Sequence, residues 1–113
     1  MLSKNCADIY NDKVIRSTQG ALFHIPVYRE DLLEVISELK EKNIEIHVTA
    51  LKMAKPLLSV SKPNNVALVF GNEGSGVSNE VIQLADQCVY IEMNTFESLN
   101  VAVAAGICMY EYK

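Results

Sequence analysis

The chain has 113 residues, the size of one ordinary domain, and half of them are apolar, so it can bury a core and is not disordered. No apolar stretch approaches the about 20 residues of a membrane helix. The first residues lack the basic end and hydrophobic run of a secretory signal. Three cysteines and two histidines are too scattered for a disulfide framework or a metal cluster: Cys6, Cys88, Cys108, His24 and His47. We therefore expect a single reduced, cytoplasmic domain, residues 1–113, with no membrane segment and no metal.

The formal net charge of −4 is unevenly distributed along the chain. Residues 1–29 hold four basic and two acidic residues, a net charge of +2. Residues 63–113 hold six acidic residues and one lysine, a net charge of −5. A strongly basic, phosphate-binding surface is therefore absent. If a nucleic acid is a partner, the N-terminal end or a segment outside this chain must supply most of the contact.

The order of apolar runs and polar breaks predicts strands that alternate with helices. A strand end at Phe23–Val27, limited by Pro26, precedes a helix from Arg29 to Asn43, whose apolar residues recur at helical spacing. The remaining expected elements are strands at 44–49, 66–70 and 88–93, a helix at 78–85 and a last helix at 98–110. The uninterrupted apolar run at 66–70 is typical of a central parallel strand. This alternation predicts an α/β domain with a parallel sheet flanked by helices.

The last predicted helix has no charged residue from Ser98 to Tyr110, and its small residues would let another backbone approach closely. These small residues are Ala102, Ala104, Ala105 and Gly106. A helix that is apolar all round must be covered all round. We expect the sheet to cover one side and a second subunit of a homodimer to cover the other.

The loop Gly71–Gly76 follows an apolar strand and precedes a helix, which is where ligands bind in open parallel sheets. A plain strand-to-helix turn is the simpler alternative. The glycine spacing is not that of a dinucleotide fingerprint, and Val77 stands where a phosphate-binding P-loop has its lysine. Glu73 adds a negative charge instead. The loop therefore suits a ligand with a neutral sugar and base, or with a positive centre, better than a nucleoside triphosphate.

A second polar loop, Glu97–Asn100, joins the last strand to the last helix. Ser98 is expected to cap this helix. Capping by Ser98 does not explain Asn100, which disfavours a helix slightly. Because loops that follow parallel strands meet at one edge of the sheet, the two loops together predict a site that neither would indicate alone.

Two long stretches, taken in order, resemble a known family. The stretch ALVFGNEGSGVSNE from Ala67 to Glu80 resembles the second motif of the SpoU (TrmH-like) branch of SPOUT methyltransferases. The stretch IEMNTFESLNVAVAAG from Ile91 to Gly106 resembles the third motif, and Lys13–Phe23 resembles the stretch before both. The resemblance implies a C-terminal trefoil α/β knot, a homodimer, S-adenosyl-L-methionine as cofactor, and methyl transfer to a ribose 2′-hydroxyl of rRNA or tRNA.

The resemblance also implies roles by position. Catalytic roles fall to Glu73, Ser98 and Asn100, and Arg16 is an RNA contact or, equally, part of a surface ion pair. The cofactor-binding positions lie in four short segments of the chain: Thr49, Ala50, Leu51, Gly71, Asn72, Glu73, Gly74, Ile91, Met93, Ser98, Leu99 and Asn100.

The sequence departs from the family pattern at its start. Members carry an earlier motif with an asparagine and an arginine, and nothing before Lys13 matches it. We therefore expect an N-terminally truncated methyltransferase domain with little turnover of its own. The alternatives are a non-catalytic fragment that binds the cofactor or dimerises, and an unrelated nucleotide-binding module.

Overall fold

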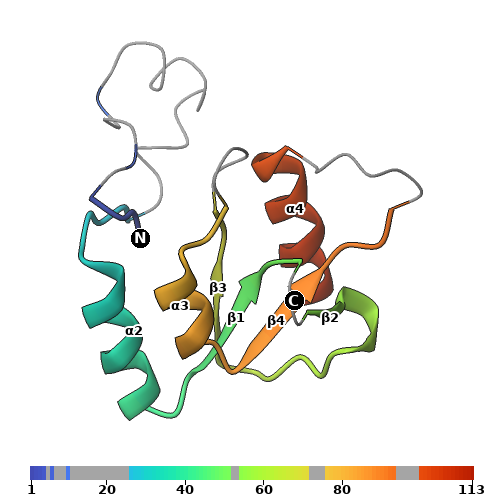
Figure 1. The fold of residues 1–113 in the computed structure, drawn as a ribbon, viewed down its shortest axis with the longest axis horizontal. Coiled ribbons are helices and arrows are strands. Elements are labelled where there is room, and N and C mark those ends of the chain that lie inside the picture. The colour runs from blue at the N-terminus through green and yellow to red at the C-terminus, as the bar shows by residue number, and fades with distance from the viewer. Residues whose placement is uncertain (5, 7–9, 11–25, 52–53, 72–75, 94–99) are drawn as a thin grey trace. The chain divides into compact units, whose positions relative to one another are not determined.

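The computed structural model describes residues 1–4, 6, 10, 26–51, 54–71, 76–93 and 100–113 (Figure 1). The chain divides into two compact units, Met1–Val35 and Ile36–Lys113. The elements in chain order are α2 (Leu32–Glu41), β1 (Glu45–Thr49), β2 (Lys55–Pro56), the 3-10 helix η2 (Leu57–Ser59), β3 (Val66–Val69), α3 (Asn79–Leu84), β4 (Gln87–Tyr90) and α4 (Val101–Glu111).

The four described strands form one parallel sheet in the order β2-β4-β1-β3, which confirms the predicted α/β class. The strand at 66–70 was expected in the centre of the sheet, but β3 ends the order of described strands and β1 lies inside it. Three consecutive side chains of β1 are buried, whereas those of β3 are half-buried. A continuous apolar run indicates that both faces of a strand are covered, and it carries no information about the strand's place in the sheet.

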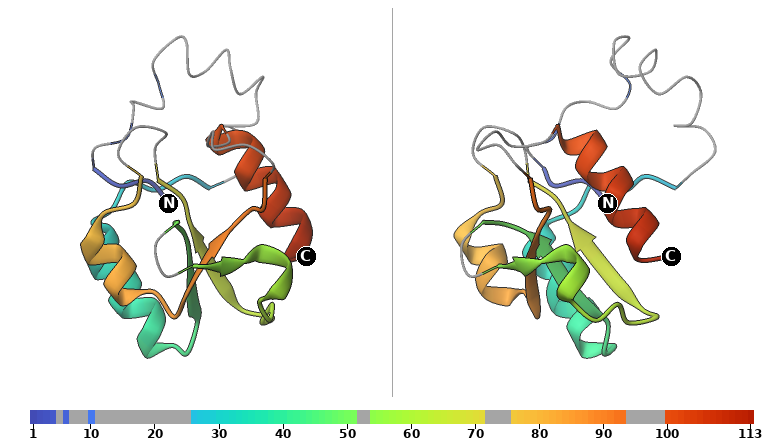
Figure 2. Two further views of the ribbon diagram at one scale, coloured as in Figure 1. Left: turned by 45° about the vertical axis from the view of Figure 1, so that its right-hand side comes forward. Right: turned by 90° about the vertical axis from the view of Figure 1, so that its right-hand side faces the viewer.

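The two faces of this sheet are covered by different helices, α3 on one and α4 on the other (Figure 2). The register pairs His47 with Leu68 and with Gln87, so their side chains share the face under α4. On that face Val89 and Cys108 are fully buried in an apolar cluster with Leu57 and Val60. The opposite face is buried against α3, which contacts β1.

The turn before β4 fixes this strand beside β1. The Asp86 carboxylate accepts a hydrogen bond from the Ile46 amide at 2.8 Å, and the Asp86 amide donates to the Ile46 carbonyl at 2.9 Å. Lys40, near the end of α2, pairs with the same carboxylate at 3.5 Å and donates to the Leu84 carbonyl at 2.6 Å. These bonds tie the amino ends of the strands together.

The helix ends follow the predicted signals in part. Asn43 stops α2 with a φ of 61°, and the Ser78 side chain accepts from the Val81 amide at the start of α3. The prediction that Ser98 caps the last helix is wrong. α4 begins after Asn100, whose side-chain oxygen accepts from the Ala102 amide at 2.8 Å. An asparagine is as good an N-cap as a serine, so sequence alone did not decide between the two.

Two further differences concern short elements. Pro26 and Val27, the described part of the strand end expected at residues 23–27, form no strand. The first unit instead has an isolated bridge between Leu2 and Arg29. The two-residue strand β2 was not predicted, because two residues cannot display an alternating pattern. The segments 72–75 and 94–99, on which the knot prediction depends, lie outside the described residues. No described helix is long and apolar enough to cross a membrane.

Candidate functional site

Three of the four predicted cofactor segments follow neighbouring parallel strands. Thr49, Ala50 and Leu51 end and follow β1, Gly71 follows β3, and Ile91 follows β4. Because β4, β1 and β3 are adjacent and parallel, their carboxyl ends meet at one edge of the sheet. The fold therefore brings these predicted site residues together.

The segment after β1 is anchored to both neighbouring strands. The Thr49 hydroxyl donates to the Val69 carbonyl at 3.3 Å, and the Ala50 amide donates to the Val89 carbonyl at 3.0 Å. Beyond these anchors Leu51 is 84% exposed, which is unusual for a leucine at the end of a buried strand. The anchored backbone holds an apolar side chain at the edge of the sheet.

The segment after β3 requires a glycine at its first position. A Cβ atom at Gly71 would lie 2.2 Å from the carbonyl carbon of Gly76 and 2.4 Å from the Val77 amide nitrogen. The backbone of Gly76 and Val77 therefore packs directly against Gly71, with no room for a side chain there. Gly76 has a φ of 67°, which also favours glycine. Backbone geometry therefore favours glycine at both described ends of this loop, at Gly71 through close packing and at Gly76 through its positive φ.

The segment after β4 runs from half-buried to exposed. Ile91 packs against the apolar cluster beneath α4, and Met93 is 40% exposed. Leu51 and Met93 thus give the strand ends exposed apolar surface. No described residue among the predicted cofactor positions carries a charge: these are Thr49, Ala50, Leu51, Gly71, Ile91, Met93 and Asn100.

The start of α4 supplies the polar residue of the site. Asn100 is exposed, and its Oδ1 atom is the N-cap of α4. The expectation that capping does not explain Asn100 is therefore wrong, since this residue is the cap. A side chain amide has donors as well as an acceptor, so capping through Oδ1 leaves its chemistry compatible with ligand binding.

The remaining predicted site residues lie outside the described residues. These are Arg16, Asn72, Glu73, Gly74, Ser98 and Leu99. Their roles stay predictions.

A polar cluster that the sequence did not predict lies where the strands begin. His47 in β1 is 1% exposed and contacts Tyr112, just after α4, and Glu45 at the start of β1. Burial raises the pKa of Tyr112 to about 12, with smaller contributions from nearby Cys108 and Glu45. Burial also raises the pKa of the Cys88 and Cys108 thiols. The available signal was a histidine between the apolar Ile46 and Val48 of a strand.

A parallel α/β sheet with a partly apolar candidate site at the strand ends is typical of many small-ligand-binding proteins, and it does not by itself define a family. The family follows from comparison with known sequences. The profile described as the SpoU rRNA Methylase family matches residues 1–110. The chain therefore belongs to the SpoU rRNA methylase family, as its two motifs predicted.

Similar proteins support this assignment. The chain is 39% identical over 114 residues to the 23S rRNA (guanosine(2553)-2′-O)-methyltransferase RlmP of Bacillus subtilis, covering 100% of this chain and 46% of that protein. The AdoMet-bound rRNA methyltransferase from Sinorhizobium meliloti superposes with a TM-score of 0.91 at 26% identity, covering 98% and 43% of the two chains.

The SpoU methyltransferase AviRb from Streptomyces viridochromogenes, in complex with the cofactor AdoMet, gives a TM-score of 0.86 at 29% identity, covering 98% and 47%. The chain thus spans less than half the length of these relatives.

Proposed function

We propose that this chain is the cofactor-binding part of an S-adenosyl-L-methionine-dependent enzyme that methylates a ribose 2′-hydroxyl of rRNA or tRNA. The observation that carries the proposal is that β4, β1 and β3 are adjacent and parallel, so that the predicted cofactor segments that follow them meet at one edge of the sheet. Membership of the SpoU family and the AdoMet-bound relatives support it. The cytoplasm, where such RNAs are modified, is the proposed location.

The described residues fit this cofactor. Exposed Leu51 and Met93 offer apolar surface to an adenine ring, and the backbone that follows β1 and β4 can hold the ring edge. The absence of a charge among the described site residues suits a sulfonium, which a lysine or arginine would repel. Asn100 can bind a hydroxyl or carboxylate of the ligand through its amide.

When bound, S-adenosyl-L-methionine would supply an electrophilic methyl group to the ribose 2′-oxygen, leaving S-adenosylhomocysteine and the proton of the 2′-hydroxyl as the other products. The chain's own residues align the two reactants, which can supply much of the rate acceleration. By their positions in the motifs, we assign Ser98 and Asn100 to holding the ribose or the cofactor. Glu73 fixes the glycine loop, and Arg16 contacts an RNA phosphate.

Two structural features belong to the same proposal. One is the C-terminal trefoil knot that the resemblance to the family implies. Two copies associate through the outward face of α4, where Val103 is 50% exposed and Met109 is 61% exposed. An apolar surface of this kind, on a helix that carries no charge from Val101 to Tyr110, is typical of a subunit interface.

Calorimetric titration with S-adenosylhomocysteine tests the proposal. The unaltered chain should bind, and Asn100→Ala should bind more weakly. Asn100→Asp keeps an N-capping oxygen but loses the amide donors, so weak binding by this variant would separate ligand contact from capping. Failure of the unaltered chain to bind would overturn the proposed cofactor site.

The reaction is tested separately with methyl-labelled S-adenosyl-L-methionine and rRNA or tRNA. A methyl group on the 2′-oxygen makes the adjacent linkage resistant to alkali, so labelled dinucleotides after alkaline hydrolysis would identify the product. Cofactor binding without any labelled RNA would favour the non-catalytic alternative. The chain spans less than half the length of its relatives.

A further inference from the structure

A fully buried histidine lies in the middle of β1, two residues before Thr49 of the candidate site. His47 is 1% exposed, and its neighbours Ile46 and Val48 are both 0% exposed. An imidazole is costly to bury unless its nitrogens are hydrogen-bonded. Both nitrogens of His47 have partners, Tyr112 for Nδ1 at 2.7 Å and Glu45 for Nε2 at 3.2 Å.

The chemistry of the partners fixes the direction of these bonds. Burial raises the pKa of Tyr112 to about 12, so its hydroxyl keeps its proton. A carboxylate only accepts hydrogen bonds, so the imidazole tautomer with its proton on Nε2 satisfies both contacts. The Tyr112 hydroxyl then donates to Nδ1, and Nε2 donates to Glu45.

Further contacts hold the Tyr112 ring in one orientation. The rings of His47 and Tyr112 meet edge to face, with centroids 5.4 Å apart and an interplanar angle of 81°. The Lys62 ammonium lies 5.9 Å from the centroid of the Tyr112 ring and donates to the Leu57 carbonyl. The Tyr112 backbone amide donates to the Cys108 carbonyl at 3.0 Å, which joins the Tyr112 backbone to the last turn of α4.

The apolar contacts of α4 are poorly suited to fixing its position. Its residues from Val101 to Cys108 are apolar on every side, and only Cys108 is fully buried. Small apolar side chains pack nearly as well after a small rotation or shift of the helix, whereas a buried hydrogen bond has one geometry. The bond between His47 and Tyr112 is therefore the feature that selects one position of α4 on the sheet.

We propose that His47 and Tyr112 are positioning residues for the cofactor site, an inference that rests on the proposed function. Tyr112 holds one end of α4, and Asn100 begins the other end, twelve residues or about 18 Å away along a helix. The pair does not touch the site. It acts by fixing α4 so that Asn100 meets the strand ends that carry Thr49 and Ile91.

The first test removes one hydroxyl. Tyr112→Phe should weaken S-adenosylhomocysteine binding roughly threefold to tenfold, the effect expected for one hydrogen bond. The matched control is Tyr28→Phe, which removes the same group from a residue that is 58% exposed and should bind like the unaltered chain. Titrations are made at a temperature where circular dichroism shows each variant folded.

A double-mutant cycle separates positioning from general stability. If Tyr112 acts through Asn100, then Tyr112→Phe should have little further effect on binding in a chain that already carries Asn100→Ala. A merely structural role would lower binding by the same factor in both backgrounds. Additive effects would therefore overturn the inference.

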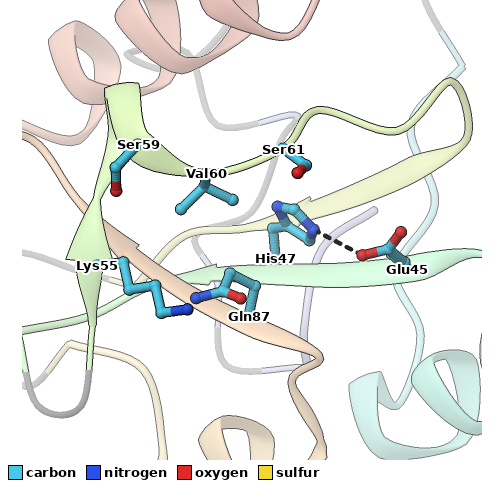
Figure 3. Close-up of a pocket in the computed structure, with 7 residues that line it drawn as sticks. All are labelled: Glu45, His47, Lys55, Ser59, Val60, Ser61 and Gln87. Atoms are coloured by element: carbon cyan, nitrogen blue, oxygen red, sulfur yellow. Dashed lines mark hydrogen bonds and ion pairs between the residues drawn. The ribbon is translucent and has the colours of Figure 1, made fainter.

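A cavity beside His47 permits a rescue experiment. It has a volume of about 330 Å³, and Figure 3 shows His47 on its wall with Glu45, Lys55 and Gln87. In His47→Ala, added imidazole can enter through this cavity and accept a hydrogen bond from the Tyr112 hydroxyl. Imidazole should restore binding to His47→Ala but not to the double variant that also carries Tyr112→Phe.

The possible outcomes distinguish the two proposals. Normal binding by Tyr112→Phe, or no rescue of His47→Ala by imidazole, would overturn the positioning role and leave the cofactor site intact. Failure of the unaltered chain to bind S-adenosylhomocysteine would overturn the proposed function and, with it, this inference.

Discussion

Gly71 shows how a single residue type is dictated by backbone geometry next to a binding site. A Cβ atom at this position would lie 2.2 Å from the carbonyl carbon of Gly76, and backbone cannot move aside as a flexible side chain can. Gly71→Ala should therefore open the loop after β3, lowering the free energy of unfolding by about 1 to 3 kcal/mol and weakening S-adenosylhomocysteine binding.

The matched control for this prediction is Gly106→Ala, because nothing lies within 4 Å of a Cβ atom at Gly106 in α4. Alanine favours a helix over glycine by about 0.5 to 1 kcal/mol, so this variant should be more stable. Urea denaturation followed by circular dichroism measures both changes. Equal stability of Gly71→Ala and the unaltered chain would contradict the close approach at this turn.

The buried phenol of Tyr112 predicts a dependence of stability on alkaline pH. Its pKa is raised from 10.0 to about 12 in the folded chain, so between these values the unfolded chain loses a proton that the folded chain keeps. The stability that the folded chain gains from a neutral Tyr112 phenol is fully present below about pH 10. It is lost as the pH rises toward about 12. Denaturation across this window should show a shallower fall of stability in Tyr112→Phe than in Tyr28→Phe. Parallel curves for the two variants would contradict the burial of Tyr112.

At the scale of elements, α4 has an inner face that packs on the sheet and an outer apolar face that is exposed in the single chain. Ala102 is on the outer face, and a lysine there would place a charge in any subunit interface. The unaltered chain should sediment as a dimer and Ala102→Lys as a monomer. Gln83→Lys on the exposed surface of α3 is the matched control and should leave the mass unchanged. A monomeric unaltered chain would refute the dimer.

The elements that sequence predicted well are those with a strong local signal. The helical spacing before Asn43, the Ser78 cap and the three apolar strands depend on neighbours in the chain. The order of the strands, the strand β2 and the choice of Asn100 as cap depend on partners distant in sequence. The motifs predict the residues of the strand-end site, whose ligand-binding role stays a prediction. The contact between His47 and Tyr112 could not be predicted, because these residues are 65 positions apart in the sequence.

At the scale of the whole molecule, the charge distribution restricts where RNA can bind. Residues 63–113, which include the glycine loop and α4, have a net charge of −5, and residues 1–29 have a net charge of +2. Phosphates should therefore contact the N-terminal residues, and the few basic residues there should give weak binding with a shallow dependence on salt, since the slope scales with the number of phosphate contacts.

A substitution of Arg16 tests this prediction most directly. Arg16→Gln should weaken binding of an rRNA or tRNA fragment and reduce the slope of log affinity against log salt by about one contact. Lys42→Gln removes the same charge from an exposed residue outside the basic segment 1–29, and should change neither quantity. Fluorescence anisotropy over a series of salt concentrations measures both. Equal effects of the two substitutions would mean that RNA responds only to net charge, and that Arg16 makes no specific phosphate contact.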